Sequence, residues 1–193
     1  MDNLDYGIIG NCKSAALVSK NGCIEWCCLP YFDSAAVFAK ILDRNKGGEF
    51  GFIVDESYQI TQKYLWGTNI LSTTFENEKN AFQVLDFMPR YKKEDGSFYA
   101  APDIVRFIRL LKGTPKFKVK FDPKLNYAKE NTFVEDHGNF IKCFTKNGKY
   151  DSMYLYSNFD YKAILEEREI TLTSNSYLLL AYHEKLTEQT LDR

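Results

Sequence analysis

Short β-prone runs, most of them followed by a tight-turn signal, recur along nearly the whole chain. The runs are rich in aromatic residues: 15 Phe, 13 Tyr and 2 Trp make up 16% of the 193 residues. Aromatic side chains favour strands, and about a dozen such runs at short, regular spacing are typical of a sandwich or a barrel. The pattern therefore predicts an all-β protein. Apolar residues make up 45% of the chain, which excludes a disordered chain.

Asn-Gly dipeptides mark two predicted hairpins. Asn21–Gly22 separates residues 15–19 from residues 23–27, and Asn147–Gly148 lies between two further apolar runs. The dipeptide is favoured in two-residue hairpin turns because both turn positions need a positive φ. Two more turns are predicted at residues 77–80 and 136–139.

Three longer runs predict strands of different character. Residues 116–121 alternate Lys with Phe or Val, so one face is apolar and the other is lysine in water. The period of two favours this interpretation of the lysines over a nucleic-acid surface. Residues 104–111 are mostly apolar despite Arg106 and Arg109, which fits a central strand with apolar neighbours on both faces. Residues 176–182 form the last clear strand.

One segment, Ser34–Leu42, has a helical pattern, and Asp33 or Ser34 is expected to cap its first turn. Its apolar stripe is formed by Val37, Phe38, Ile41 and Leu42. A weaker helix candidate is Tyr161–Arg168. No linker and no repeat of fixed period divides the chain. We therefore expect a single domain over residues 1–193.

Charge and hydropathy exclude several classes of partner. The 25 Lys and Arg nearly balance the 26 Asp and Glu, for a net charge of −1, so the strong positive field of a nucleic-acid-binding protein is absent. No apolar run reaches about 18 residues, so we expect no membrane-spanning helix. The first residues lack the basic-then-apolar order of a signal peptide, which favours a cytoplasmic location.

Cysteine and histidine are too few and too scattered for a predicted metal site. Cys12, Cys23, Cys27 and Cys28 lie near the start, Cys143 is alone, and the two histidines are His137 and His183. Structural zinc needs four convergent ligands. We interpret the cysteines as small buried apolar side chains in a reducing compartment. No metal and no cofactor is expected, and neither histidine lies beside a serine in the context of a catalytic triad.

The corner at Trp26–Ser34 is the strongest candidate for contact with a ligand. A strand is expected to end at Pro30, and the chain then turns at Asp33. Aromatic rings followed by a carboxylate suit a sugar, because rings stack on C–H faces and the carboxylate accepts from hydroxyls. The alternative is a helix cap with a hydrophobic staple. Trp66 is a second stacking candidate, or else it covers the edge of the core.

Two ordered motifs resemble a known family. Residues 5–18 read DYGIIGNCKSAALV, and residues 21–34 read NGCIEWCCLPYFDS. They resemble the amino-terminal domain of bacterial and archaeal glycoside hydrolase family 15 enzymes, the glucoamylase-like and trehalase-like proteins. Further matches follow in the family's order at Tyr64, residues 68–71, Thr74-Phe75, residues 86–89, residues 104–106 and residues 121–127.

The chain departs from the family pattern at several positions. Asn11 and Asn126 stand where the family usually has Asp, Lys13 and Tyr31 where it has Arg, and Ala35 where it has Pro. If position 11 helps to shape a sugar site, these changes bear on the substrate preference. The candidate substrate-proximal residues are Asn11, Lys13, Trp26, Tyr31, Phe32 and Asp33, with Trp66 as a candidate stacking platform.

The resemblance implies a large antiparallel two-sheet β-sandwich (super-sandwich) with one or two short helices. In the family this domain precedes an (α/α)₆ barrel that carries both catalytic glutamates and inverts the anomeric carbon. These 193 residues hold no succession of long amphipathic helices to build that barrel. We therefore expect a non-catalytic amino-terminal domain that packs against the barrel, inactive alone and cut from a longer chain.

Two alternatives and one consequence remain. The chain would otherwise be a free-standing carbohydrate-binding module that binds an oligosaccharide through Trp66, Trp26 or Tyr31. A mutarotase-like sandwich that epimerises sugars would need a His/Glu pair in a cleft. Separation from a barrel would expose an apolar face, so self-association through that face is expected.

Overall fold

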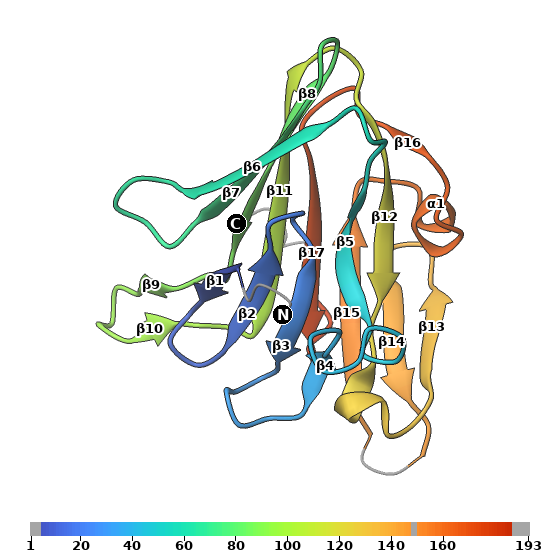
Figure 1. Ribbon diagram of the computed structural model, residues 1–193. Helices are drawn as coiled ribbons and strands as arrows, with labels where there is room; N and C mark the ends of the chain where they lie inside the picture. The colour runs from blue at the N-terminus through green and yellow to red at the C-terminus, as the bar shows by residue number, and fades with distance from the viewer. Residues whose placement is uncertain (1–4, 148–149, 187–193) are drawn as a thin grey trace.

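The computed structural model describes residues 5–147 and 150–186, which form two antiparallel sheets packed face to face (Figure 1). The predicted two-sheet sandwich is confirmed. The eight-stranded sheet contains, in spatial order, β13 (Thr132–Asp136), β14 (Ile141–Thr145), β15 (Ser152–Ser157), β17 (Ser176–Tyr182), β11 (Asp103–Lys112), β8 (Ala81–Phe87), β7 (Leu71–Glu76) and β6 (Gln59–Tyr64).

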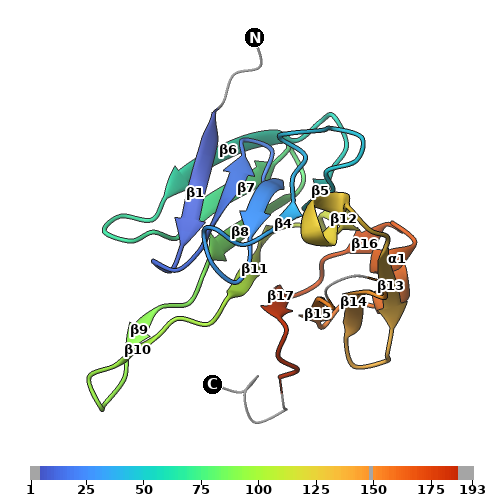
Figure 2. The same cartoon turned by 90° about the horizontal axis from the view of Figure 1, so that it is seen from below.

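The seven-stranded sheet is assembled mainly from the first half of the chain. Its order is β1 (Tyr6–Gly10), β2 (Ala15–Ser19), β3 (Ile24–Cys28), β5 (Glu49–Ile53), β12 (Lys116–Asp122) and β16 (Ile170–Thr171), and β4 (Ala36–Phe38) pairs with β3. A separate hairpin of β9 (Tyr91–Lys92) and β10 (Phe98–Tyr99) links β8 to β11. Figure 2 shows this hairpin projecting beyond both sheets.

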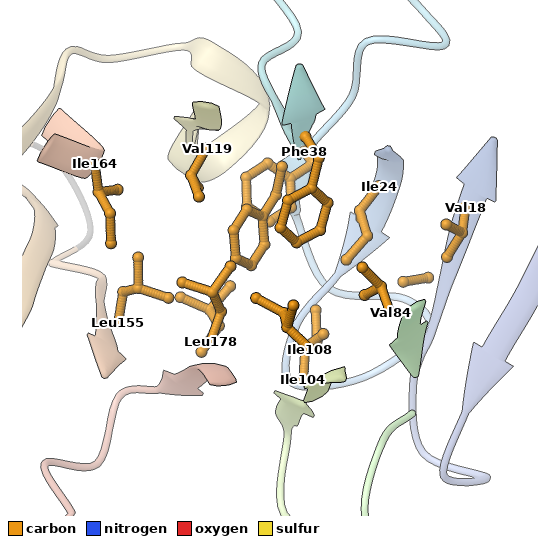
Figure 3. Packing of buried hydrophobic residues seen from close by; sticks show 14 of the residues in the cluster. Val18, Ile24, Phe38, Val84, Ile104, Ile108, Val119, Leu155, Ile164 and Leu178 are labelled. Carbon is orange, nitrogen blue, oxygen red and sulfur yellow. The ribbon is translucent and has the colours of Figure 1, made fainter. Parts of the chain in front are cut away.

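The core lies between the facing sides of the two sheets. Because successive strand residues point to opposite faces, the long strands β8, β11 and β17 bury mainly every second side chain. The labelled residues in Figure 3 come from both sheets and from the short helix that contains Ile164: Val18, Ile24, Phe38, Val84, Ile104, Ile108, Val119, Leu155, Ile164 and Leu178. Aromatic rings fill part of this core: Phe75 of β7 and Phe82 of β8 face each other across the two paired strands and stack with centroids 4.5 Å apart.

Most of the predicted strands are confirmed, with one change at a turn. β12 and β11 contain residues 116–121 and 104–111, and β17 spans residues 176–182. The hairpin at Asn21–Gly22 is present, but only Gly22 has a positive φ, of 71°. The Gly22 N–H donates to the Ser19 carbonyl over 2.8 Å, so one left-handed glycine closes a longer loop. The Asn147–Gly148 turn lies partly outside the described residues.

The predicted helix at Ser34–Leu42 is wrong. Residues 36–38 form β4, which pairs with β3 in the register Cys27↔Phe38 and Cys28↔Ala36. All three residues of β4 are buried, whereas Leu42 is 69% exposed, so the expected stripe does not form one continuous buried face. Tertiary pairing outweighs the local pattern here. Asp33 therefore caps no helix.

The weaker helix candidate is confirmed in shortened form. Helix α1 spans Tyr161–Leu165, and the Asp160 carboxylate caps it by accepting from the Lys162 N–H over 3.1 Å. A short 3₁₀ segment, η1, spans Leu125–Ala128. Among the described residues, no helix has the length and apolar character that crossing a bilayer requires.

A buried ion pair links the two sheets through the core. Arg106 on β11 and Asp86 on β8 are both fully buried, and the guanidinium contacts the carboxylate over 2.8 and 3.1 Å. The same guanidinium donates across the core to the carbonyl of Phe50, over 2.6 Å, and to that of Gly22. Burial raises the pKa of Asp86, and the charge of Arg106 opposes this shift.

Removing one partner of this pair should be costly. Arg106→Met leaves the Asp86 carboxylate buried without its counter-charge, so the free energy of unfolding should fall by about 3–5 kcal/mol. The double variant Arg106→Met/Asp86→Leu retains no buried charge, and its loss should be smaller than the sum of the single losses.

Urea unfolding followed by circular dichroism measures these losses. Arg109→Met is the matched control, because Arg109 is an exposed arginine on the same strand, and its effect should stay within about 0.5 kcal/mol. Additive losses for Arg106 and Asp86 would contradict the coupling.

Candidate functional site

Four connections gather at one end of the sandwich, here called the loop end. They are the β1–β2 turn (residues 11–14), the β3–β4 turn (residues 29–35), the β6–β7 turn (residues 65–70) and the β9–β10 hairpin with its flanks (residues 88–102). The Asn69 side chain donates to the Gly10 carbonyl over 2.7 Å, which ties the β6–β7 turn to the β1–β2 turn. The loop end therefore combines segments from both sheets.

Asn11 is the buried centre of the loop end. Its side chain is 1% exposed, and its Oδ1 accepts from the N–H groups of Lys13 and Ser14, both over 3.0 Å. Its Nδ2 donates to the Ala101 carbonyl over 2.8 Å, which ties the turn to the flank of the β9–β10 hairpin. The side-chain amide thus holds the backbone of two loops, and an amide suits this task because it both donates and accepts.

The β3–β4 turn is fixed against the β1–β2 turn by two contacts. The Phe32 N–H donates to the Lys13 carbonyl over 3.0 Å, and the Ser14 hydroxyl donates to the Cys28 carbonyl. Within the turn, the Tyr31 N–H donates to Ser34 Oγ over 3.1 Å. The backbone of this corner is therefore held from several sides.

The side chains of this corner point into solvent. Tyr31, Phe32, Asp33 and Lys13 are all exposed, so two aromatic rings, a carboxylate and an ammonium group lie on adjacent turns. Sugars are bound by groups of these kinds, because aromatic rings stack on the apolar C–H face of a sugar ring and charged groups hydrogen-bond to its hydroxyls. The structure thus brings these four predicted residues to one surface, with Asn11 beneath them.

Trp66 and Trp26 differ sharply in their surroundings. Trp66, in the β6–β7 turn, is 99% exposed, so the interpretation that it covers the edge of the core is wrong. Trp26 is half-buried on the outer face of β3, packed near Cys28 and 6.3 Å from the Tyr127 ring. Trp26 therefore belongs to a strand face rather than to the exposed loops.

The β9–β10 hairpin is a part of the loop end that the sequence patterns did not reveal. Tyr91 and Phe98 are exposed, the Tyr91 and Tyr99 rings stack with centroids 4.8 Å apart, and the Arg90 guanidinium lies 4.0 Å from the Phe98 centroid. Its turn contains Gly96 in the left-handed region, with φ at 82°. The dipeptide Asp95-Gly96 is the signal that could have found it.

Asp103 is a buried carboxyl at the base of this hairpin. Burial raises its pKa to about 6, the nearby Glu184 adds to the shift, and the Tyr99 hydroxyl, 3.4 Å away, opposes it. Burial and the Asp103 charge in turn raise the pKa of Tyr99 to about 12. A proton is therefore gained or lost at the root of the hairpin at mildly acid pH.

A second titratable cluster lies on the outer face of the seven-stranded sheet. Ligand atoms of Cys23, Glu25 and Glu49 lie within 4.8 Å of one another, beside a hollow of about 260 Å³. Each carboxylate already has an internal partner, because Lys40 pairs with Glu49 over 2.6 Å and the Tyr6 hydroxyl donates to Glu25 over 2.6 Å. Burial raises the pKa of the Cys23 thiol, which disfavours the thiolate that a metal would need.

The remaining cysteines and the histidines hold no comparable site. Cys27, Cys28 and Cys143 are buried as expected, but Cys12 is exposed in the β1–β2 turn, which corrects that interpretation. His137 Nε2 lies 3.5 Å from Glu135 Oε2 in an exposed turn. Neither this pair nor His183 lines either of the two hollows described, of which the larger, about 440 Å³, lies between β1 and β6.

Comparison with known proteins gives one consistent family. A family model described as trehalase-like, N-terminal, matches residues 5–169. A trehalase of Thermoplasma volcanium is 38% identical over 140 residues, which cover 70% of this chain and 22% of that protein. No solved structure matches the chain at a significant level.

Two further relatives extend the similarity along the chain. A trehalase of Thermoplasma acidophilum is 33% identical over 86% of this chain and 29% of its own length. A second trehalase, trehalase 2 of Sulfolobus acidocaldarius, is 32% identical over 95% of this chain and 29% of its own length. The chain thus spans under a third of the curated relatives that it matches.

The Asp103 carboxyl should make stability fall as pH rises. Its pKa of about 6 in the folded protein exceeds the ordinary value of 3.8, so the folded state binds more protons in this range. The free energy of unfolding should therefore decrease between about pH 4 and pH 6, by up to about 3 kcal/mol. Asp103→Asn removes this dependence, so the variant should gain stability over the wild type across that range. Parallel pH profiles of urea unfolding would contradict this.

Proposed function

Because this chain belongs to the trehalase-like N-terminal family, we propose that it is the non-catalytic amino-terminal domain of a longer α-glucosidic hydrolase. The observation that carries the proposal is the pairing of two facts. The family match covers residues 5–169, and the same chain spans only 22–29% of each of the three trehalases described above. Trehalose is the substrate that the names of these relatives favour.

The bond cleavage itself is assigned to the rest of the polypeptide. Inverting glycosidases use one carboxylic acid to protonate the leaving oxygen and one carboxylate to activate water, about 6.5–9.5 Å apart. In the resemblance described above, both groups belong to an (α/α)₆ barrel that follows this domain. The sandwich then contributes position and shape, and the barrel is its intramolecular partner.

The loop end is the part of the domain that we assign to the rim of the substrate site. Buried Asn11 holds the β1–β2 turn and the hairpin flank, so the exposed side chains of Lys13, Tyr31, Phe32 and Asp33 project from a fixed backbone. A rigid base is what a binding contact needs, because loops that must be ordered on binding lose affinity. These four residues would stack on and hydrogen-bond to a glucose unit.

A free-standing carbohydrate-binding module is the second candidate, and one observation favours it. The Trp66 indole is 99% exposed on a projecting turn, and a large aromatic ring open to water is the usual form of a sugar-stacking platform. Such a module would bind oligosaccharide with this chain alone.

We also propose a cytoplasmic location, which the five cysteines without a disulfide favour.

The first test is the mass of the native polypeptide. An immunoblot of source-cell extract with an antibody against this domain should show one band about three times larger than 22.4 kDa, because the aligned residues and their covered shares make the relatives about three times as long as this chain. A band at 22.4 kDa would instead favour the free-standing module, and titration of this chain with oligosaccharide would then decide.

The second test probes the rim in the native polypeptide. The double variant Tyr31→Ala/Phe32→Ala loses both exposed rings, so KM for trehalose should rise about tenfold, which corresponds to about 1.4 kcal/mol, with a smaller change in kcat. Ile53→Ala is the control, because this exposed residue lies on β5 at a distance from the loop end. An unchanged KM in the double variant would remove these rings from the substrate site.

A further inference from the structure

The outer face of the eight-stranded sheet is unusually apolar at its centre. Ile104, Arg106 and Ile108 of β11 point into the core, so Val105 and Phe107 point outward. The register aligns them with outward residues of the neighbouring strands. The resulting patch, here called the β11 face, consists of Leu85, Phe87, Val105, Phe107, Tyr177 and Leu179, each only half-buried.

The other sheet shows what a solvated outer face looks like in the same molecule. β12 presents Lys116, Lys118 and Lys120 outward, and two of these pair with glutamates of the segment that follows α1. An apolar row, Ile8–Leu17–Trp26, is confined to β1–β3. The β11 face has no charged member, and its half-buried side chains adjoin one another across three strands. Contiguous apolar surface that water still reaches is typical of an interaction site.

The described chain runs onto the β11 face after its last strand. The end of β17 lies opposite the start of β11, in the register Asp103↔Ala181. The Leu186 N–H donates to the Tyr156 hydroxyl over 2.9 Å, and Leu186 packs on the cluster that contains Phe140, Tyr156 and Ala181. Tyr156 in turn pairs with Leu179. Leu186, the last described residue, therefore lies on the same outer side of the sheet as the β11 face.

The β9–β10 hairpin rises from the same edge. It connects β8 to β11, the two strands that carry Phe87 and Val105, and it projects beyond the sheets with Tyr91 and Phe98 exposed (Figure 2). The apolar β11 face and the projecting aromatic hairpin together offer a partner two adjoining contact surfaces. The β11 face spans three neighbouring strands, β8, β11 and β17, and the projecting hairpin extends the surface beyond them.

We infer that the β11 face is the docking surface for the domain that follows Leu186 in the longer relatives. The inference rests on the proposed function for the existence of that domain, and it adds which side of the sandwich the domain covers. The relatives supply an occupant of sufficient size, because more than two thirds of their length lies outside the match. The charged outer face of β12 stays in solvent.

Site-specific photo-crosslinking in the native polypeptide tests this. Tyr177→p-benzoylphenylalanine keeps an aromatic ring on the β11 face, and irradiation followed by mass spectrometry identifies the peptide that it reaches. Phe87→p-benzoylphenylalanine is a second probe of the same face, should the first variant fold poorly. Ile53→p-benzoylphenylalanine, on the outer side of β5, is the matched control.

The expected result is a crosslink from position 177 or 87 to a peptide beyond residue 193, within one polypeptide, and none from position 53. Crosslinks to a second copy of the chain, or downstream crosslinks from position 53 alone, would overturn the inference.

Trehalose hydrolysis by the same sample before irradiation separates the two proposals. If the sample hydrolyses trehalose but gives no crosslink, the β11 face is not the docking surface and the proposed function stands. If the crosslink forms but the sample does not hydrolyse trehalose, the docking surface stands and the proposed function is rejected. A native polypeptide no longer than this chain overturns both.

Discussion

The guanidinium of Arg106 sets the relative position of the two sheets. It pairs with Asp86 inside its own sheet and donates to the carbonyls of Phe50, on β5 of the other sheet, and of Gly22, in the turn that joins β2 to β3. Apolar contacts between sheets tolerate small shifts, but a buried guanidinium must keep its oxygen partners because an unpaired buried charge is very costly. The Phe50 and Phe52 rings lie 4.9 Å from it and complete the site. One side chain thus fixes β11, β5 and the turn before β3 together.

This fixed frame has consequences at the loop end. β3 starts beside the Gly22 carbonyl and ends at Cys28, whose carbonyl accepts from Ser14. β11 starts just after Ala101, whose carbonyl accepts from Asn11. The turns that carry exposed rings are therefore anchored to strands whose mutual position the core has already set. Rigid anchors with exposed tips are what a contact surface requires.

The sequence predicted the strands well because their period of two is a local signal. It failed at residues 36–38, where Ala-Val-Phe is buried by pairing with β3 and the apolar stripe resembles a helix only in isolation. Arg106 was visible inside an apolar run, but its partner lies 20 residues away and only the β8–β11 register brings them together. The exposure of Trp66 and the projection of the β9–β10 hairpin depend likewise on how the loops leave the sheets, which no local pattern encodes.

The apolar character of β11 on both faces has a physical explanation in this arrangement. A strand at the surface of an isolated sandwich normally alternates apolar and polar residues, as β12 does with Phe117, Lys118 and Val119. β11 instead reads as a strand covered on both sides. The core covers Ile104 and Ile108, while the described residues leave Val105 and Phe107 only half covered. The run at residues 104–111 is thus apolar on both faces because one face packs in the core of the sandwich and the other, we propose, packs against the domain that follows.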